Sequence, residues 1–154
     1  MEPGGRLILM SSISSIMVPA PPSSPIPSSP PYQQLTGTQG VPRHAIYAAS
    51  KAAVTGLVKC LAWDLGPKNI TVNCIAAGGV KSDMYTENSR KYLKGGDTLS
   101  WDEIDARIAA WSPLNRVGMP DDIAGAVALL VSQEAGWITG QTVHVSGGAH
   151  MGTA

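Results

Sequence analysis

Three short stretches of the chain have the apolar pattern of strands that are buried on both faces. Residues 6–10 (RLILM) are apolar after Arg6 and are followed by serines, residues 70–76 (ITVNCIA) are followed by a glycine pair, and residues 141–148 (QTVHVSGG) lie near the C-terminus. Short apolar runs that end at serine or glycine are typical of strands inside a sheet. The sequence therefore predicts three strands.

Between these stretches the apolar residues recur at helical spacing. Residues 43–66 predict a long helix that Gly66 and Pro67 end. Its expected apolar stripe consists of Ile46, Val54, Leu57, Val58, Leu61 and Leu65. Shorter helices are predicted over residues 82–93, 100–111 and 120–132. Ser100 and Glu103 match a capping box, and Pro120 suits a first helical turn.

Strands that alternate with helices predict an α/β fold with a parallel sheet. In such sheets the ligands gather at the carboxyl ends of the strands. Three polar or glycine-rich segments fall at predicted strand ends: Ser11-Ser12, residues 77–79 and Gly147-Gly148. We therefore expect a functional site where these three segments meet.

The segment from Val18 to Gln39 interrupts this pattern. It holds seven of the chain's 12 prolines and no charged residue. Proline has no amide hydrogen for helix or sheet hydrogen bonds, so residues 18–39 predict a disordered, Pro/Ser-rich insertion within a domain that spans residues 1–154.

Composition narrows the classes of function. The formal net charge is zero, so the chain has no electrostatic footprint for a nucleic acid or an anionic membrane. The apolar run of residues 123–131 is too short to span a bilayer, and the N-terminus does not have the pattern of a secretory signal. Cys60 and Cys74 are expected to be reduced core thiols of a cytoplasmic protein, and no metal site is expected.

Tyr47 and Lys51 carry the clearest chemical signal. They lie four positions apart in the helix predicted over residues 43–66, so their side chains share a face. A nearby ammonium ion favours the phenolate form of a tyrosine, which can then exchange a proton with an alcohol or ketone oxygen. Ser12, at a neighbouring strand end, could hold the same oxygen. The alternative is an ordinary solvated Tyr–Lys pair.

Four motifs give the chain a resemblance to a known family. GGRLILMSS, YAASKAAV, ITVNCIAAGG and WITGQTVHVSGG, in this order, resemble the short-chain dehydrogenase/reductase family. The segments GGVKSDMYTENSRKY, WSPLNRVGMPDDIA and GGAHM are similar to the fungal polyhydroxynaphthalene reductases of melanin biosynthesis. The resemblance implies the C-terminal half of a Rossmann-type doubly wound sheet.

The resemblance also implies roles for individual residues. Ser12 would polarise the carbonyl oxygen, Tyr47 would be the general acid, and Lys51 would bind the nicotinamide ribose. The implied cofactor-binding residues are Tyr47, Lys51, Gly78, Gly79, Val80, Ser82 and Met84. The implied substrate-binding residues are Tyr85, Tyr92, Trp111 and Met151, and Trp111 could instead be a core residue. His44, His144 and His150 have no ligand spacing, and the acids of residues 101–105 and of the segment DDIA are expected to serve helix starts.

The insertion separates two residues of the implied site. Ser12 and Tyr47 are 35 positions apart, and without residues 18–39 they would be 13 apart. A flexible insertion adds little loop-closure entropy, so it does not prevent the two residues from meeting. We interpret the insertion as a translated, unremoved intron, since valine codons begin with GT and a glutamine codon can end in AG. A genuine surface loop is the alternative, and a proline-motif ligand for another domain is a third interpretation.

The implied activity is the reduction of a ketone or keto-naphthol by NADPH, with NAD a less favoured cofactor. A 3-ketoacyl or sugar-alcohol reductase acting on a polyol-type substrate, and a non-catalytic assembly module, remain alternatives. The glycine-rich phosphate turn of the family is absent from these 154 residues. We therefore expect the chain alone to bind NADPH weakly or not at all and its first strand to be left at a sheet edge. The intact family member is expected to be a homo-oligomer, a tetramer.

Overall fold

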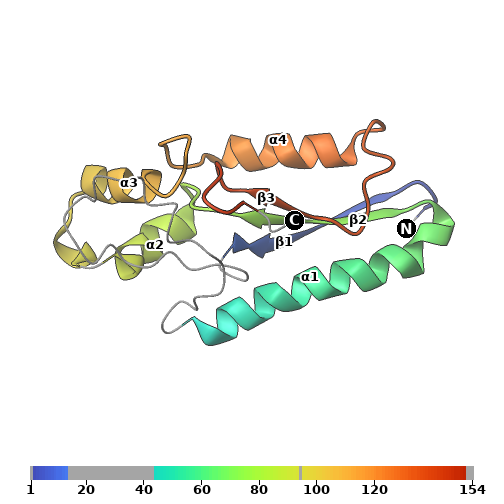
Figure 1. The fold of residues 1–154 in the computed structure, drawn as a ribbon, viewed down its shortest axis with the longest axis horizontal. Helices are drawn as coiled ribbons and strands as arrows, with labels where there is room; N and C mark the ends of the chain where they lie inside the picture. The colour runs from blue at the N-terminus through green and yellow to red at the C-terminus, as the bar shows by residue number, and fades with distance from the viewer. Residues whose placement is uncertain (1, 14–43, 94, 152–154) are drawn as a thin grey trace.

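The computed structural model describes residues 2–13, 44–93 and 95–151, and the insertion predicted over residues 18–39 lies outside them. The described part contains a parallel sheet of three strands in the order β1-β2-β3 (Figure 1). The strands are β1 (Arg6–Ser12), β2 (Thr71–Ala77) and β3 (Thr142–Val145). This confirms the α/β fold with a parallel sheet that the sequence predicts.

The register brings the carboxyl ends of the three strands to one level. Ser12 pairs with Ala77, and Ala77 pairs with Val145. β2 is the central strand, and its residues from Thr71 to Ala76 are buried. Among the described residues β1 pairs with β2 only, so it lies at an edge of the sheet, as expected.

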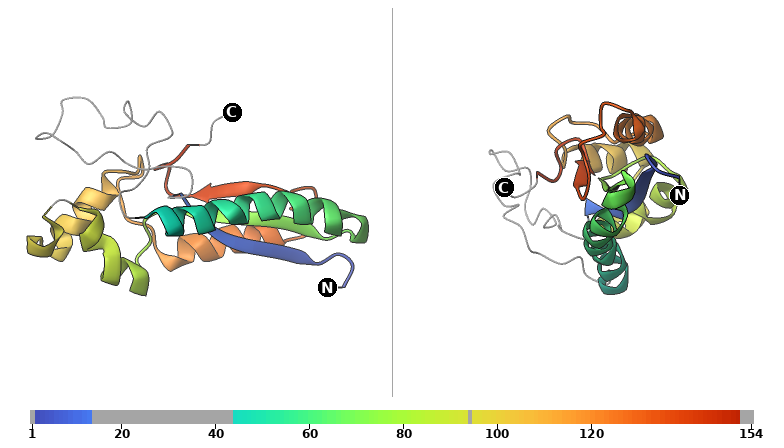
Figure 2. Two further views of the ribbon diagram at one scale, coloured as in Figure 1. Left: turned by 90° about the horizontal axis from the view of Figure 1, so that it is seen from below. Right: turned by 90° about the vertical axis from the view of Figure 1, so that its right-hand side faces the viewer.

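One long helix covers each face of the sheet. α1 (Ala45–Leu65) lies along one face and α4 (Pro120–Val131) along the other, so the described part has three layers (Figures 1 and 2). Two short 3-10 helices, η3 (Gly66–Lys68) and η4 (Gly96–Thr98), were not predicted from the sequence.

The main core lies between α1 and the sheet. Val58 of α1 is fully buried against Ile70, Val72 and Cys74. The partly buried residues that pack around them are Leu7, Leu9, Val54, Leu61, Ala62 and Leu65. The predicted stripe of α1 is therefore wrong at two positions, because Ile46 and Leu57 are 88% and 47% exposed.

α1 is the one described helix whose length and mean hydropathy would also suit a membrane span. The core helix of a soluble protein passes the same test. In this structure Val58 and its neighbours on α1 pack against β2, while only 6% of the apolar window of the helix is buried.

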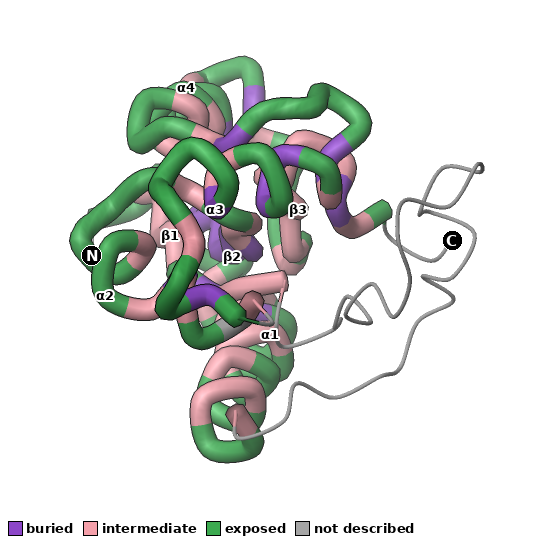
Figure 3. The backbone as a smooth tube through the Cα atoms, turned by 90° about the vertical axis from the view of Figure 1, so that its left-hand side faces the viewer, coloured by how far each residue is buried: buried purple, intermediate pink, exposed green. Residues whose placement is uncertain are grey.

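α2 (Asp83–Tyr92) and α3 (Trp101–Ala109) form a second unit beside the strand ends, with a small core of their own. Ile104, Ile108, Ala109 and Val117 are its buried members. Ser82 caps α2, and Ser100 and Glu103 form the predicted capping box of α3, which confirms both helix starts. Figure 3 shows buried segments in this region and around β2.

The two cysteines differ in their surroundings. Cys74 is fully buried in the main core, where burial raises the pKa of its thiol, and this agrees with the expectation. Cys60 is exposed on α1, so its assignment to the core was wrong. Both thiols are free.

Candidate active site

The carboxyl ends of β2 and β3 meet so closely that only glycine fits at the junction. The amide of Gly78 donates to the carbonyl oxygen of Val145 at 3.0 Å, and a Cβ atom at Gly78 would lie 2.8 Å from the Cα atom of Ser146. The amide of Gly118 donates to the carbonyl oxygen of Gly79 at 2.9 Å. The expected gathering of strand ends is thus confirmed, and it places the half-buried Gly78 and the exposed Gly79 at the rim of one site.

Lys51 connects α1 with the end of β1. Its Nζ donates to the carbonyl oxygen of Met10 at 3.3 Å, and its own carbonyl oxygen accepts a hydrogen bond of 2.8 Å from Ser11 Oγ. The same Nζ lies 5.8 Å from the centre of the Tyr47 ring. The structure therefore brings the Tyr47 turn of α1 to the end of β1, across the 35 positions that separate Ser12 from Tyr47 in the sequence.

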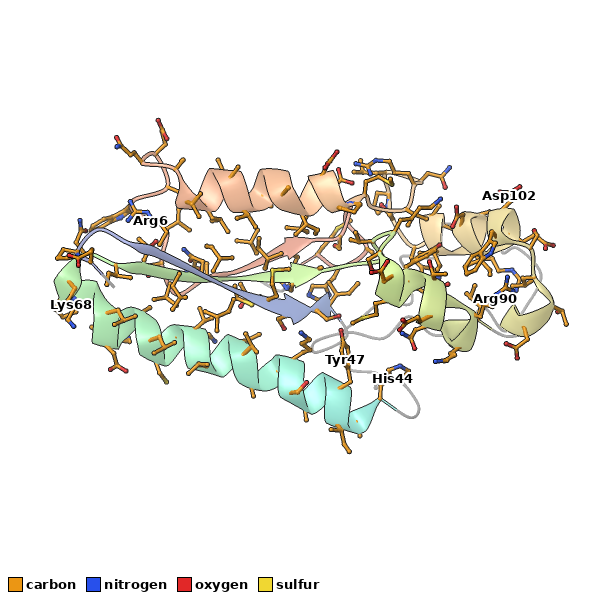
Figure 4. All side chains as sticks on the ribbon, turned by 180° about the vertical axis from the view of Figure 1, so that it is seen from behind. Arg6, His44, Tyr47, Lys68, Arg90 and Asp102 are labelled. Carbon is orange, nitrogen blue, oxygen red and sulfur yellow. The ribbon has the colours of Figure 1, made fainter. Side chains whose placement is uncertain are left out.

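The side chain of Tyr47 points from α1 towards the carboxyl end of β1 (Figure 4). His44 lies next to it, with the two rings edge to face and their centres 6.4 Å apart. Tyr47 is half-buried. The general-acid role of Tyr47 stays a prediction that this position suits.

Ser11 and Ser12 have different surroundings. Ser11 is 5% exposed. Its hydroxyl group donates a hydrogen bond to the carbonyl oxygen of Lys51, so Ser11 links β1 to α1. Ser12 is the last residue of β1, is half-buried, and pairs in register with Ala77 beside the glycine pair. These positions are consistent with the choice of Ser12 over Ser11 as the residue that would polarise a carbonyl oxygen.

Apart from Tyr47 and Lys51 on α1, the residues assigned to the cofactor lie in the connection from β2 to α2 and in the first turn of α2. Val80 bridges to Gly118, and Ser82 Oγ accepts a hydrogen bond from the amide of Tyr85 at 3.4 Å. Met84 is exposed. An ammonium ion, a phenol and a serine hydroxyl at this edge fit the sugar hydroxyl groups at the nicotinamide end of a dinucleotide. The described residues fit the nicotinamide end of the cofactor. They include no glycine-rich turn that would bind its phosphate groups.

The residues assigned to the substrate lie on the second unit and on the segment after β3. Tyr85 and Trp111 pack against the core of α2 and α3, so Trp111 is partly a core residue. Met151 is exposed. Tyr92 ends α2, and its side chain lies outside the part that the structure describes.

Ser112 was not singled out in the sequence, and it joins these two regions. Its Oγ donates to the carbonyl oxygen of Gly147 at 2.5 Å and accepts from the amide of Leu114 at 3.1 Å. The segment that carries Met151 is thereby fastened to the turn that follows Trp111. No spacing or motif marks this serine, because its partner lies 35 residues away in the chain.

Asp105 corrects a second expectation. Glu103 serves the start of α3 as predicted, but Asp105 accepts a hydrogen bond of 2.6 Å from the Tyr85 hydroxyl group and forms an ion pair with Lys81. The sequence reasoning missed the contacts of Asp105 with Lys81 and Tyr85. Across the described residues, no three His, Cys, Asp or Glu side chains gather as ligands of a metal ion would.

The comparisons with known proteins agree with this geometry. Residues 32–150 match the family profile described as "Enoyl-(Acyl carrier protein) reductase". The chain is 42% identical, over 98% of its length, to the tetrahydroxynaphthalene reductase of Pyricularia oryzae, and 43% identical, over 95%, to the versicolorin reductase stcU of Emericella nidulans. It covers 46% and 47% of these relatives, so it spans about half of their length.

Solved structures give the same result. A short-chain dehydrogenase family protein from Francisella tularensis superposes with a TM-score of 0.70 at 26% identity, over 96% of this chain and 52% of the other. The angucycline C-6 ketoreductase LanV with bound NADP superposes with a TM-score of 0.65 at 26% identity, over 97% of this chain and 45% of the other. The chain therefore belongs to the short-chain dehydrogenase/reductase family.

Proposed function

We propose that this chain supplies the proton-donating and substrate-binding part of a reductase that converts an aromatic ketone to an alcohol with NADPH. The observation that carries the proposal is the position of Lys51, whose Nζ lies between the end of β1 and the ring of Tyr47. Lys51 thereby fastens the turn of α1 that carries Tyr47 beside the end of β1, where the phenol of Tyr47 would meet a ketone oxygen.

In the proposed reaction Tyr47 gives its proton to the carbonyl oxygen of the substrate. Ser12 donates a hydrogen bond to the same oxygen, so that the carbonyl carbon becomes a better acceptor of hydride. Lys51 compensates the charge that Tyr47 acquires. The reduced nicotinamide, when bound, supplies the hydride.

Support for a nicotinamide cofactor comes from the family and from the NADP that is bound in LanV. We propose NADPH as the reductant and expect the chain by itself to bind it weakly. Its described residues offer groups for the ribose beside the nicotinamide, namely Lys51 and Tyr47, and no glycine-rich turn for the phosphates.

We propose a hydroxylated aromatic ketone as the substrate, because Tyr85 and Trp111 lie together on the unit beside the strand ends. The names of the relatives, a tetrahydroxynaphthalene reductase and a versicolorin reductase, point in the same direction. The second candidate is an acyl-thioester substrate, which the description of the matching family profile favours. A flat naphthalenone and a linear ketoacyl thioester distinguish the two candidates in one assay.

We also propose that the complete protein is a homo-oligomer in which α1 packs against a second copy of itself. Leu57 and Trp63 on α1 are 47% and 85% exposed. Large apolar side chains that face water on a helix are typical of an interface with another chain. Analytical ultracentrifugation of the complete protein and of its Trp63→Glu variant tests this arrangement.

The function is tested with a hybrid enzyme, in which this chain replaces the part of the Pyricularia oryzae reductase that it matches. We expect the hybrid to consume NADPH when a hydroxylated naphthalenone is present, and more slowly with a linear ketoacyl thioester. Lys51→Met is expected to lower kcat by about a hundredfold, the scale on which proton-transfer groups act. Lys59→Met is the matched control, because Lys59 is an exposed lysine of the same helix.

Two results would contradict the proposal. One is a hybrid that folds, binds NADPH and reduces neither ketone. The other is a loss of activity in Lys51→Met that Lys59→Met reproduces, since the position of Lys51 would then have no special importance.

A further inference from the structure

Asp105 of α3 lies between two residues that flank the start of α2. Tyr85 donates its hydroxyl hydrogen to Oδ1 of Asp105 at 2.6 Å, and Lys81 forms an ion pair with Oδ2. The side chains of Lys81 and Asp105 are 44% and 27% exposed, so this ion pair lies at the surface of the molecule. The three residues tie α2 to α3 and leave one side of the cluster open.

The open side of the cluster is a shallow surface cavity of about 350 Å³ that is widely open to solvent. A cavity of this volume is large enough for a small aromatic ligand. Tyr85 and Trp101 contribute aromatic rings to its wall, and the guanidinium of Arg90 lies 4.4 Å from the centre of the Trp101 ring. The remaining lining residues are Lys81, Ser82, Asp83, Thr86 and Asp105. The cavity joins Ser82, which the sequence assigns to the cofactor, with Tyr85, which it assigns to the substrate.

The hydrogen bond to Asp105 decides what the Tyr85 oxygen can offer to a ligand. A phenol has one hydrogen to donate, and an ionised carboxylate can only accept. Burial opposes the ionisation of Asp105, but the hydrogen bonds from Lys81 and Tyr85 and the positive charge of Lys81 lower the pKa of its carboxyl below the usual range. Burial and the contact with Asp105 raise the pKa of the Tyr85 phenol above its usual value, so the proton stays on Tyr85 at neutral pH.

We propose that Asp105 is a positioning residue that sets ligand specificity. Because it takes the hydroxyl hydrogen of Tyr85, it leaves the Tyr85 oxygen as an acceptor for a hydroxyl group on an aromatic ligand in this cavity. The cavity thereby selects hydroxylated aromatics over the same molecules with their oxygens methylated. The inference rests on the proposed function only for the aromatic class of the ligand.

The test measures binding of two probes to the 154-residue chain, without a cofactor. The probes are 1,8-dihydroxynaphthalene and 1,8-dimethoxynaphthalene, and the method is isothermal titration calorimetry. We expect the dihydroxy compound to bind about fivefold more tightly, which is the effect of one hydrogen bond. Tyr85→Phe keeps the ring and removes the acceptor, so it should weaken the dihydroxy compound alone and abolish the preference.

Asp105→Asn tests the positioning role, and Asp102→Asn is the matched control, an exposed aspartate of the same helix outside the cavity. Asp105→Asn should reduce the preference and allow the Tyr85 phenol to ionise at lower pH, measured from its ultraviolet absorbance against Tyr85→Phe. Asp102→Asn should change neither. A residue with a purely structural role would alter stability without moving the ratio of the two affinities or this ionisation.

Equal affinities for the two probes, no saturable binding of either, or a preference that survives in Tyr85→Phe would each overturn the inference. The ratio is taken within each variant, so partial loss of folding does not imitate the expected result. The proposed function can fail separately, because reduction of a ketone by the hybrid enzyme does not enter this measurement.

Discussion

The substitution Gly78→Ala tests whether the close junction of β2 and β3 holds the site together. A Cβ atom at this position would lie 2.8 Å from both the Cα and the Cβ of Ser146. The Cα belongs to the backbone that follows β3, so the two segments would have to separate by roughly 0.6 Å to reach ordinary contact. Overpacking of this kind costs about 1–3 kcal/mol of unfolding free energy.

Gly125→Ala is the matched control for this experiment. Gly125 lies inside α4, and a Cβ atom there would meet nothing within 4 Å. Alanine is the better helix former, so this variant should gain about 1 kcal/mol. Thermal unfolding followed by circular dichroism should show Gly78→Ala melting roughly 5–10 °C below the wild type and Gly125→Ala slightly above it. A Gly78→Ala variant that melts with the wild type would refute the reasoning.

Three further predictions concern the core, a histidine pair and the second unit. Val58→Ala removes two methyl groups from a fully buried site and should cost about 2–3 kcal/mol in urea unfolding; a loss below about 0.5 kcal/mol would contradict the packing described for α1. Burial and the nearby His150 lower the pKa of His144, so the folded state binds fewer protons than the unfolded state as the pH falls. The urea concentration at the unfolding midpoint should therefore decrease as the pH is lowered below about 6.5, and His144→Gln should weaken this pH dependence. Arg90 donates to the carbonyl oxygens of Gly96 and Leu99 at 2.8 and 2.6 Å, so Arg90→Lys should speed amide exchange in residues 95–101 about fivefold, and unchanged exchange would count against this role.

Much of the fold was predictable because its signals are local. Apolar runs mark the three strands, and the capping pattern of Ser100 and Glu103 marks the start of α3. The glycines at residues 78 and 79 follow β2 directly, so the meeting of strand ends also followed from the sequence. The pairing of Tyr47 with Lys51 was readable because four residues on a helix bring two side chains to one face.

The remaining features depend on contacts between distant segments. Asp105 looks like a helix-start acid in the sequence, and only the packing of α3 beside α2 shows that it meets Tyr85 and Lys81. The exposure of Ile46 and Cys60 was missed for a related reason. Periodicity predicts that a helix has an apolar face, but it does not say how wide a strip the sheet covers.

The account depends most on the claim that Tyr47 is the proton donor at the end of β1. The most direct measurement is kcat for ketone reduction by the hybrid enzyme with Tyr47→Phe, which keeps the ring and removes the proton. We predict a loss of about a hundredfold or more in kcat measured at saturating NADPH, since general acids contribute on that scale. A Tyr47→Phe enzyme that keeps its kcat within about threefold, far less than a general acid contributes, would contradict the account.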